Sequence, residues 1–318
     1  MLKWIWFVIA LVMLLSALVI TCGGLGFAAA NLPAAFGAFT RISGFAYGLD
    51  ARQRLDLYVP QGAGARPVVV FWYGGSFDSG LRVRYRFVGA ALANAGYLAI
   101  LPDYRVYPQV KFPGFAQDAA QALVWAHEHA RQYGGDPQRL FVMGHSAGAW
   151  LAAMLAYNPR YLAAAGGERR WIRGLLGLSG PYALAPDTAE LHAIFGPPYT
   201  PADWQPVRFV DAAAPPSLLL HGLDDTTVSV RHTRALTVAL QAAGVAVDAR
   251  LYPHRAHGDT VAALAVLARG RAPVLAQIRA FIDGEAARAP SSANSAVQRA
   301  NRSVALTSSW TVPASNAE

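Results

Sequence analysis

Apolar and polar positions between residues 45 and 287 repeat with two different periods. Short runs of β-branched, leucine and aromatic residues are typical of strands that are buried on both faces. Such runs occur at 68–72, 97–101, 140–143, 175–178, 217–221 and 247–251. Stretches with apolar residues three or four positions apart predict helices at 83–95, 115–133, 231–243 and 273–287. Strands that alternate with helices predict an α/β domain, in which helices cover both faces of a mainly parallel sheet.

Four segments depart from this rhythm. Residues 45–48 and 54–59 alternate apolar and polar positions, as the half-buried strands of a hairpin do. Residues 134–137, Gly-Gly-Asp-Pro, predict a stop and a turn. Residues 184–214 are rich in proline and aromatic residues, so we expect a short cap or pocket wall, apolar enough for a hydrophobic acyl or aryl group. An ordinary long surface connection is the alternative.

The two ends of the chain differ from the rest. Lys3 precedes an uncharged apolar run, and residues 1–30 are therefore expected to form a signal-anchor. This predicts a membrane-anchored protein whose folded domain lies outside the cytoplasm. A cleaved signal peptide with a small-residue site at 28–30, and thus a secreted protein, is the alternative. Residues 31–44 are expected to be a linker, residues 45–287 the folded domain, and residues 288–318 a disordered tail.

Composition narrows the classes of function. Apolar residues make up 54% of the chain and charged residues 14%, so a large core is easily built. The formal net charge is +8, but Lys and Arg are scattered without interleaved aromatic residues, which argues against nucleic-acid binding. The single cysteine, Cys22, excludes a disulfide framework, and no Cys/His spacing predicts a metal site. We expect neither a metal nor an organic cofactor, and composition does not indicate an oligomeric state.

The candidate chemistry centres on residues 144–148, Gly-His-Ser-Ala-Gly. They follow a predicted strand and precede an alanine- and leucine-rich helical pattern, which is the setting of a G-x-S-x-G nucleophile elbow. Ser146 would then lie at the apex of a strained turn, flanked by glycines because a Cβ atom would clash there. The helix that begins behind Ser146 would direct free N–H groups and its positive dipole end toward the hydroxyl.

A serine hydroxyl needs a base to remove its proton, and the base needs an orienting acid. In a parallel sheet both belong on loops after late strands, in the chain order Ser, Asp, His. Asp224 and Asp225 follow the strand 217–221, and either residue fits as the acid. His254 and His257 follow the last strand, and His257 is favoured because it stands beside a glycine before a helical pattern.

The remaining histidines are expected to have no part in proton transfer. His145 and His221 stand beside glycines at strand ends, where we expect buried packing residues. The others lie in polar or helical surroundings and are expected to face solvent: His127, His129, His192 and His232.

A glycine pair follows the strand 68–72, where an oxyanion hole would be built. Glycines there let the backbone turn its N–H groups into the pocket. The candidate donors are the backbone N–H groups of Gly75, Ser76 and Ala147. Each such donor typically lowers the barrier by about 3 kcal/mol.

With these residues in place, the chain resembles the α/β-hydrolases of the carboxylesterase branch, similar to hormone-sensitive-lipase-like, feruloyl-esterase-like and kynurenine-formamidase-like enzymes. The resemblance runs from about residue 45 to 285. Its motifs are residues 47–48, 55–60, 102–105, 134–137 and the H-G-x-x-D-x-x-V pattern at 221–228. The last pattern implies Asp225 as the triad acid. One departure is Tyr73, which stands where the family's oxyanion loop has a histidine, with Phe77 as its aromatic partner.

The resemblance implies a serine hydrolase that cleaves small to medium carboxylic esters through an acyl-enzyme, with Ser146, His257 and Asp225 as the triad. Amidase, formamidase or peptidase chemistry uses the same residues and stays an alternative. A non-catalytic binding protein on a hydrolase fold is a third interpretation, because Tyr73 leaves the shape of the oxyanion loop open. A tyrosine hydroxyl could itself serve as an oxyanion donor if the ring turned inward.

Overall fold

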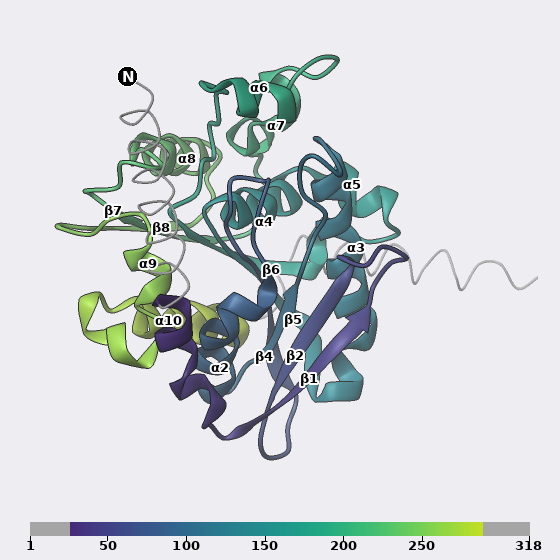
Figure 1. The fold of residues 1–318 in the computed structure, drawn as a ribbon, viewed down its shortest axis with the longest axis vertical. Helices are drawn as coiled ribbons and strands as arrows, with labels where there is room; N and C mark the ends of the chain where they lie inside the picture. The colour runs from purple at the N-terminus through teal and green to yellow at the C-terminus, as the bar shows by residue number, and fades with distance from the viewer. Residues whose placement is uncertain (1–25, 289–318) are drawn as a thin grey trace, which may run out of the picture.

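A computed structural model describes residues 26–288 and shows one sheet of eight strands (Figure 1). The strands lie in the spatial order β1-β2-β4-β3-β5-β6-β7-β8. The first two pairs are antiparallel, and every pair from β4 onward is parallel. The bounds are β1 Phe39–Ala46, β2 Arg54–Pro60, β3 Arg66–Trp72, β4 Leu98–Pro102, β5 Gly135–His145, β6 Ile172–Leu178, β7 Ser217–Gly222 and β8 Val247–Tyr252.

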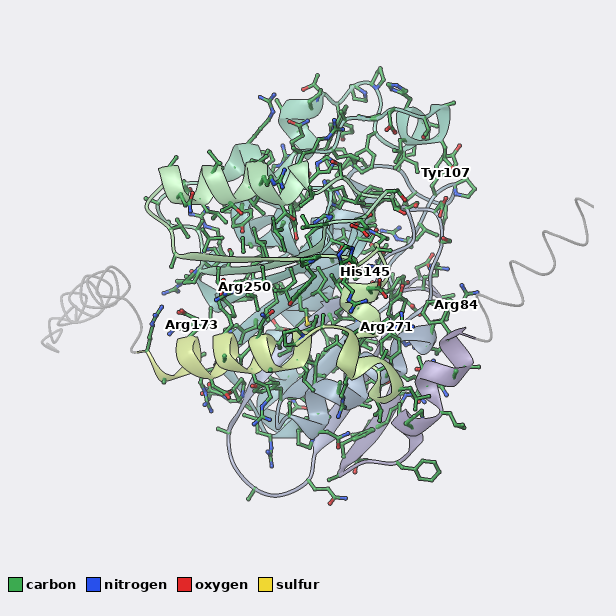
Figure 2. All side chains as sticks on the ribbon, turned by 90° about the vertical axis from the view of Figure 1, so that its left-hand side faces the viewer. Arg84, Tyr107, His145, Arg173, Arg250 and Arg271 are labelled. Atoms are coloured by element: carbon green, nitrogen blue, oxygen red, sulfur yellow. The ribbon has the colours of Figure 1, made fainter. Side chains whose placement is uncertain are left out.

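Helices cover both faces of the sheet (Figures 1 and 2). On one face α2 (Arg86–Asn94) packs on β2 and β4, and α10 (Val274–Ala287) packs on β6 and β7. On the other face lie α3 (Gly114–His129), α4 (Ala147–Tyr157) and α8 (Arg231–Ala242). This arrangement confirms the predicted α/β fold with a mainly parallel, two-sided sheet.

Short helices join these elements. The α-helices are α5 (Pro159–Ala164), α6 (Ala189–Ile194), α7 (Pro201–Trp204) and α9 (Asp259–Ala262). The 3-10 helices are η1 (Pro33–Ala35), η2 (Arg82–Tyr85), η3 (Ala130–Tyr133), η4 (Arg169–Trp171), η5 (Pro206–Phe209) and η6 (Val266–Arg271).

The predicted linker 31–44 is wrong from residue 39 onward, because β1 begins at Phe39 and pairs with the whole of β2. The register shifts between Ser43 and Phe45, at Gly44, whose φ is +87°. Such a bulge breaks the alternation by which a strand is recognised. The Arg41 guanidinium, 2.6 Å from the buried Asp56 carboxylate, helps to fix this edge strand.

The predicted turn at 134–137 is also wrong beyond its first residue. Gly134 has a left-handed φ of +74° and ends η3, but β5 begins directly at Gly135. The strand is therefore longer than its apolar run, because Gly135 and Asp136 pair with Arg66 and Pro67 at the edge of the core.

Most of the predicted signal-anchor, residues 1–25, and the predicted tail from residue 289 lie outside the described residues. Residues 26–31 are helical and pack beside η2. The Asn31 side chain bonds the Arg84 carbonyl and the Phe87 N–H, each at 2.9 Å, and the Phe27 ring meets the Tyr85 ring edge-on at 5.3 Å. Within residues 26–288, no helix combines the length and apolar character needed to cross a membrane.

Candidate active site

Ser146 lies between β5 and α4, at the carboxyl end of the central parallel strands. Its φ of 55° and ψ of −124° place a non-glycine residue in a strained conformation. The Ser146 N–H is held by the Leu178 carbonyl at 2.9 Å, and its own carbonyl accepts bonds from the first turn of α4. The serine is thus fixed at the start of a helix, where an anionic oxygen is stabilised by the helix dipole.

The glycines on either side of the serine are required by packing. A Cβ on Gly144 would overlap the backbone of Gly148, and a Cβ on Gly148 would overlap the Trp72 carbonyl. The elbow therefore brings α4 into direct backbone contact with β3. The glycines of the motif allow the turn to pack against β3, which precedes the predicted oxyanion loop at residues 73–80.

Asp225 and His257 meet after β7 and β8. His257 Nδ1 lies 2.8 Å from Asp225 Oδ2, while the backbone N–H groups of Thr227 and Val228 bond the other carboxylate oxygen. Asp224 and His254 form a separate, exposed pair 3.8 Å apart. Of the two aspartates and two histidines that the sequence offered, the structure therefore joins the predicted Asp225 and His257 in a part-buried hydrogen bond.

A second histidine also binds the Asp225 carboxylate. His221 is buried, and its Nε2 lies 3.1 Å from Asp225 Oδ2 and 2.9 Å from the Val228 carbonyl. Because both partners are acceptors, Nε2 carries the proton, and Nδ1 accepts the Thr233 hydroxyl at 2.7 Å. Burial alone would raise the pKa of Asp225, but the bonds from His221, His257 and Val228 lower it well below its ordinary value. The carboxylate is thus ionised and fixed beneath His257.

Ser146 and His257 line the same cavity, which has a volume of about 270 Å³. Among the hydrogen bonds of residues 26–288, none joins the Ser146 hydroxyl to the His257 ring. Catalytic hydrogen bonds are often long in unliganded enzymes and tighten only when substrate is bound. The buried Asp225 carboxylate thus bonds His257, and His257 and Ser146 both border the cavity.

The loop after β3 faces Ser146. A Cβ on Gly74 would lie 2.8 Å from the Ser146 Cβ, and Gly75 has a φ of +139° that favours glycine. Ser76 follows with a φ of 48°, and its N–H has no acceptor among the described residues. Ala147 is the first residue of α4, so its N–H also lacks an intrahelical acceptor. The predicted donors Gly75, Ser76 and Ala147 all border the cavities that meet at Ser146.

Tyr73 is turned away from this site. Its ring is buried and stacks on Tyr104 and Tyr85, with centroid distances of 4.8 and 5.6 Å. Burial raises the pKa of its phenol far above the ordinary value. The hydroxyl receives a bond from Arg52 at 3.3 Å, inside the core. Tyr73 therefore packs beneath the oxyanion loop, and the alternative of an inward-turned tyrosine donor is wrong.

Arg52, which the sequence analysis did not single out, connects this loop to its neighbours. From the turn between β1 and β2, its guanidinium bonds the Gly80 carbonyl at 2.8 Å and the Tyr104 carbonyl at 2.9 Å. One cation thus ties both ends of the oxyanion loop to the loop after β4. The only sequence signal was an arginine beside the motif at 55–60.

His145 has more contacts than a packing residue needs. Its Nε2 lies 3.1 Å from the backbone carbonyl of His257, and the two imidazole rings are 4.8 Å apart. Nε2 therefore carries a proton, and the buried Nδ1 has no partner among the described residues. Burial, with the nearby His257, lowers the pKa of His145 to about 3. His145 is a neutral residue that ties the elbow to the loop of the predicted base.

A second cavity, of about 390 Å³, borders Ser146 on another side. The segment 184–214 supplies one wall, as predicted, and this wall is mixed, because Leu184, Ala185 and Leu191 line it beside Asp187 and Glu190. Asp187, Glu190 and Arg231 line the cavity. Two of its aromatic side chains are buried: the Phe195 ring packs against Trp150 and Trp204, and Trp150 Nε1 donates to the Trp204 carbonyl at 2.8 Å.

His232 also lines this cavity and was wrongly expected to face solvent. It is buried, and its Nδ1 accepts the Ala183 N–H at 3.2 Å. Burial lowers its pKa to about 4. Within the described residues, no cluster of three or more His, Cys, Asp or Glu side chains could hold a metal ion.

Comparison with known protein families identifies the family of this chain. A model of the prolyl oligopeptidase family matches residues 116–284, more than half of the chain, and a second model, BD-FAE, matches residues 55–163. The chain is an α/β-hydrolase of the prolyl oligopeptidase family. The first match spans the elbow and both later loops, and the second spans the oxyanion loop and the elbow.

Individual relatives of this α/β-hydrolase are esterases. Isoprenylcysteine alpha-carbonyl methylesterase ICME of Arabidopsis thaliana is 31% identical over 236 residues, which cover 67% of this chain and 55% of that protein. Carboxylic ester hydrolase LipN of Mycobacterium tuberculosis is 32% identical, over 63% of this chain and 59% of that protein. The chain thus spans little more than half the length of these curated relatives.

Solved structures agree with the fold. A hyperthermophilic esterase from the archaeon Pyrobaculum calidifontis superposes with a TM-score of 0.67 at 26% identity, over 84% of this chain and 92% of that one. The predicted resemblance to carboxylesterase-type α/β-hydrolases is therefore confirmed.

Proposed function

We propose that this chain is a serine hydrolase that cleaves small to medium carboxylic esters, with Ser146 as nucleophile, His257 as base and Asp225 as orienting acid. One observation carries the proposal. The buried Asp225 carboxylate bonds His257 at 2.8 Å, and this histidine opens on the same cavity as Ser146 at the strained elbow. The esterase names of the relatives support the ester as substrate class.

The reaction divides into two acyl transfers. His257 Nε2 takes the Ser146 proton as Oγ attacks the ester carbonyl carbon, and the carbonyl π electrons move onto oxygen. The tetrahedral oxyanion accepts bonds from the backbone N–H groups of Gly75, Ser76 and Ala147. It collapses when His257 returns the proton to the departing alcohol. Water then cleaves the acyl-enzyme by the same steps, and Asp225 stabilises the imidazolium each time.

Hydrolysis of p-nitrophenyl acetate by the full chain tests this proposal. Ser146→Ala should reduce turnover to background while the circular dichroism spectrum stays that of the wild type. Ser229→Ala is a matched control, because this exposed serine lines the cavity beside Ser146 and should leave turnover unchanged. Equal turnover in the wild type and Ser146→Ala would refute Ser146 as the nucleophile.

Amide or peptide hydrolysis is a second candidate function, favoured by the match to the prolyl oligopeptidase family. An amide nitrogen is a poorer leaving group than an alcohol, so His257 would have to protonate it earlier. Parallel assays with p-nitroanilides and p-nitrophenyl esters separate the two activities. A non-catalytic binding protein would be indicated if a fluorophosphonate failed to label Ser146.

We also propose that the apolar residues before Gly26 anchor the protein in a membrane, with the folded domain outside the cytoplasm. The support is the sequence alone: Lys3 is followed by a long uncharged run. Mass measurement of the mature N-terminus, together with protease accessibility in spheroplasts, tests this topology. A mature chain that begins after residue 30 would instead indicate secretion.

A further inference from the structure

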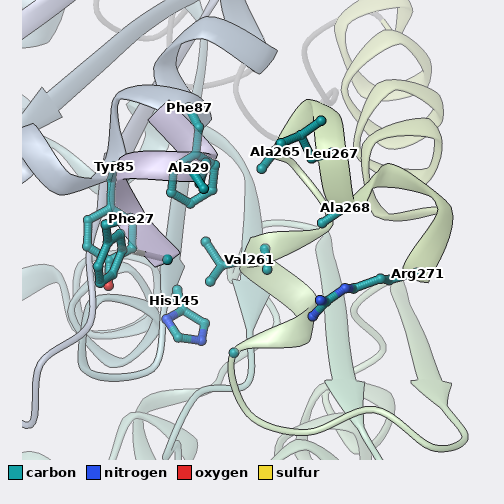
Figure 3. A pocket seen from close by; sticks show the side chains of 14 residues that line it. Phe27, Ala29, Tyr85, Phe87, His145, Val261, Ala265, Leu267, Ala268 and Arg271 are labelled. Carbon is teal, nitrogen blue, oxygen red and sulfur yellow. The ribbon is translucent and has the colours of Figure 1, made fainter. Parts of the chain in front are cut away.

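An apolar groove of about 480 Å³ lies between the start of the described chain and the loop that follows His257 (Figure 3). Phe27 and Ala29 belong to one wall, beside Tyr85. Val261 and Leu267, from α9 and η6, belong to the facing wall. The proposed reaction uses none of these side chains.

The groove adjoins the cavity that Ser146 and His257 line. Phe27, Tyr85 and His145 line both spaces. His145 directly precedes Ser146, and Gly258 in the groove wall directly follows His257. An extended molecule that lies in the groove would therefore have one end next to Ser146.

The walls provide almost no charge for a ligand. Among the described lining residues, only Arg271 carries an ionised side chain, and its guanidinium is paired with Asp259 at 2.7 Å. His145 is neutral at physiological pH because burial lowers its pKa to about 3. Leu267 is 75% exposed at the rim, which leaves apolar surface uncovered. These walls suit a hydrocarbon chain rather than a polar or charged group.

We propose that this groove binds the apolar chain of an amphiphilic ester whose carbonyl lies at Ser146 and whose polar part faces Asp187, Glu190 and Arg231 in the other cavity. The proposal rests on the esterase function above and extends its substrate class to esters with a long apolar chain. Each buried methylene adds about fourfold to binding. A longer chain should therefore raise kcat/KM until the groove is filled.

Two tryptophan variants of the full chain test the groove. Ala29→Trp fills it from one wall, and Ala268→Trp fills it from the other. Ala28→Trp is the matched control, because Ala28 is exposed on the same helical turn but does not line the groove. The substrates are p-nitrophenyl acetate and dodecanoate, and the acetates of ethanol and dodecanol, all at one fixed detergent concentration. The two series distinguish an acyl chain from an alcohol chain in the groove.

The expected result is a change in chain-length preference without a change in chemistry. Both groove variants should hydrolyse p-nitrophenyl acetate as the wild type does. For the dodecyl substrate of one of the two series, kcat/KM of the groove variants should be lower than that of the wild type by about fifteenfold or more. This is the loss expected when the tryptophan keeps two methylenes of the chain out of the groove. Ala28→Trp should keep the wild-type profile.

Other outcomes separate this inference from the esterase function. Acetate hydrolysis with unchanged chain-length profiles in both groove variants overturns the groove but leaves the esterase standing. A wild type that hydrolyses no ester refutes the proposed function itself. Groove variants that alter the oligomeric state on size-exclusion chromatography, with the profiles unchanged, indicate an interface between copies and overturn the substrate groove.

Discussion

His145 should make the stability of the folded chain depend on pH. Burial lowers the pKa of its imidazole from 6.5 to about 3, so the ring stays neutral in the folded chain while it becomes protonated in the unfolded chain. The free energy of unfolding is therefore highest above pH 6.5 and falls as the pH drops toward 3. Between pH 8 and pH 5 the loss from this residue is about 2 kcal/mol, from the protonation of an ordinary histidine.

His145→Gln should remove this dependence, because glutamine has no titratable group and can still donate to the His257 carbonyl. Urea unfolding, followed by tryptophan fluorescence at several pH values, gives the free energy of unfolding for each variant. The variant should lose about 2 kcal/mol less than the wild type between pH 8 and pH 5. His254→Gln is the control, because His254 is 91% exposed and its loss should not alter the slope. Identical slopes for the wild type and His145→Gln would falsify the neutral, buried state of His145.

Three further substitutions test the site. Asp225→Asn should lower kcat by about 10⁴-fold, because an amide in place of the carboxylate holds the His257 ring in the wrong tautomer. Asp224→Asn should stay near wild type, and equal effects of the two variants in an ester hydrolysis assay would contradict the assignment of the acid. Gly148→Ala places a methyl group against the Trp72 carbonyl and should cost about 3 kcal/mol or more in urea unfolding; a stable variant would contradict the close approach of α4 to β3. Tyr73→Phe should keep kcat within about threefold, since the ring packs below the loop and one lost oxyanion donor would cost about 10²-fold or more.

The sequence predicted the parts of the fold that depend on long apolar runs. The central strands are buried on both faces, so their β-branched and leucine residues form uninterrupted signals, as at residues 68–72 and 217–221. Edge strand β1 was recognised only in its last part. Its residues are half exposed, and the alternation of apolar and polar residues is broken at Gly44. The residue pattern alone therefore could not define where the strand begins.

The candidate triad could be proposed from the sequence because each of its residues follows a strand, in the order Ser146, Asp225, His257. Contacts between different loops could not be predicted in this way. Arg52 reaches the oxyanion loop from a turn more than twenty positions away, and His232 is buried and accepts a hydrogen bond from the Ala183 N–H. Composition described 184–214 only in part, since Phe195 and Trp204 pack into the core while Asp187 and Glu190 lie at the cavity beside Leu184 and Leu191. Burial of a side chain depends on its neighbours in space, which a single sequence does not contain.

Two cavities meet at Ser146, one toward the segment 184–214 and one toward His257 and the N-terminal helical turn. In a two-step hydrolase, this geometry gives the departing alcohol and the remaining acyl group separate exits. Water for the second step can then enter through the space that the alcohol has vacated, without displacing the acyl group. The alcohol leaves first because the acyl group is bound covalently to the serine, and the two cavities let it leave without crossing the acyl group. A narrowing of either cavity should slow a different half of the reaction.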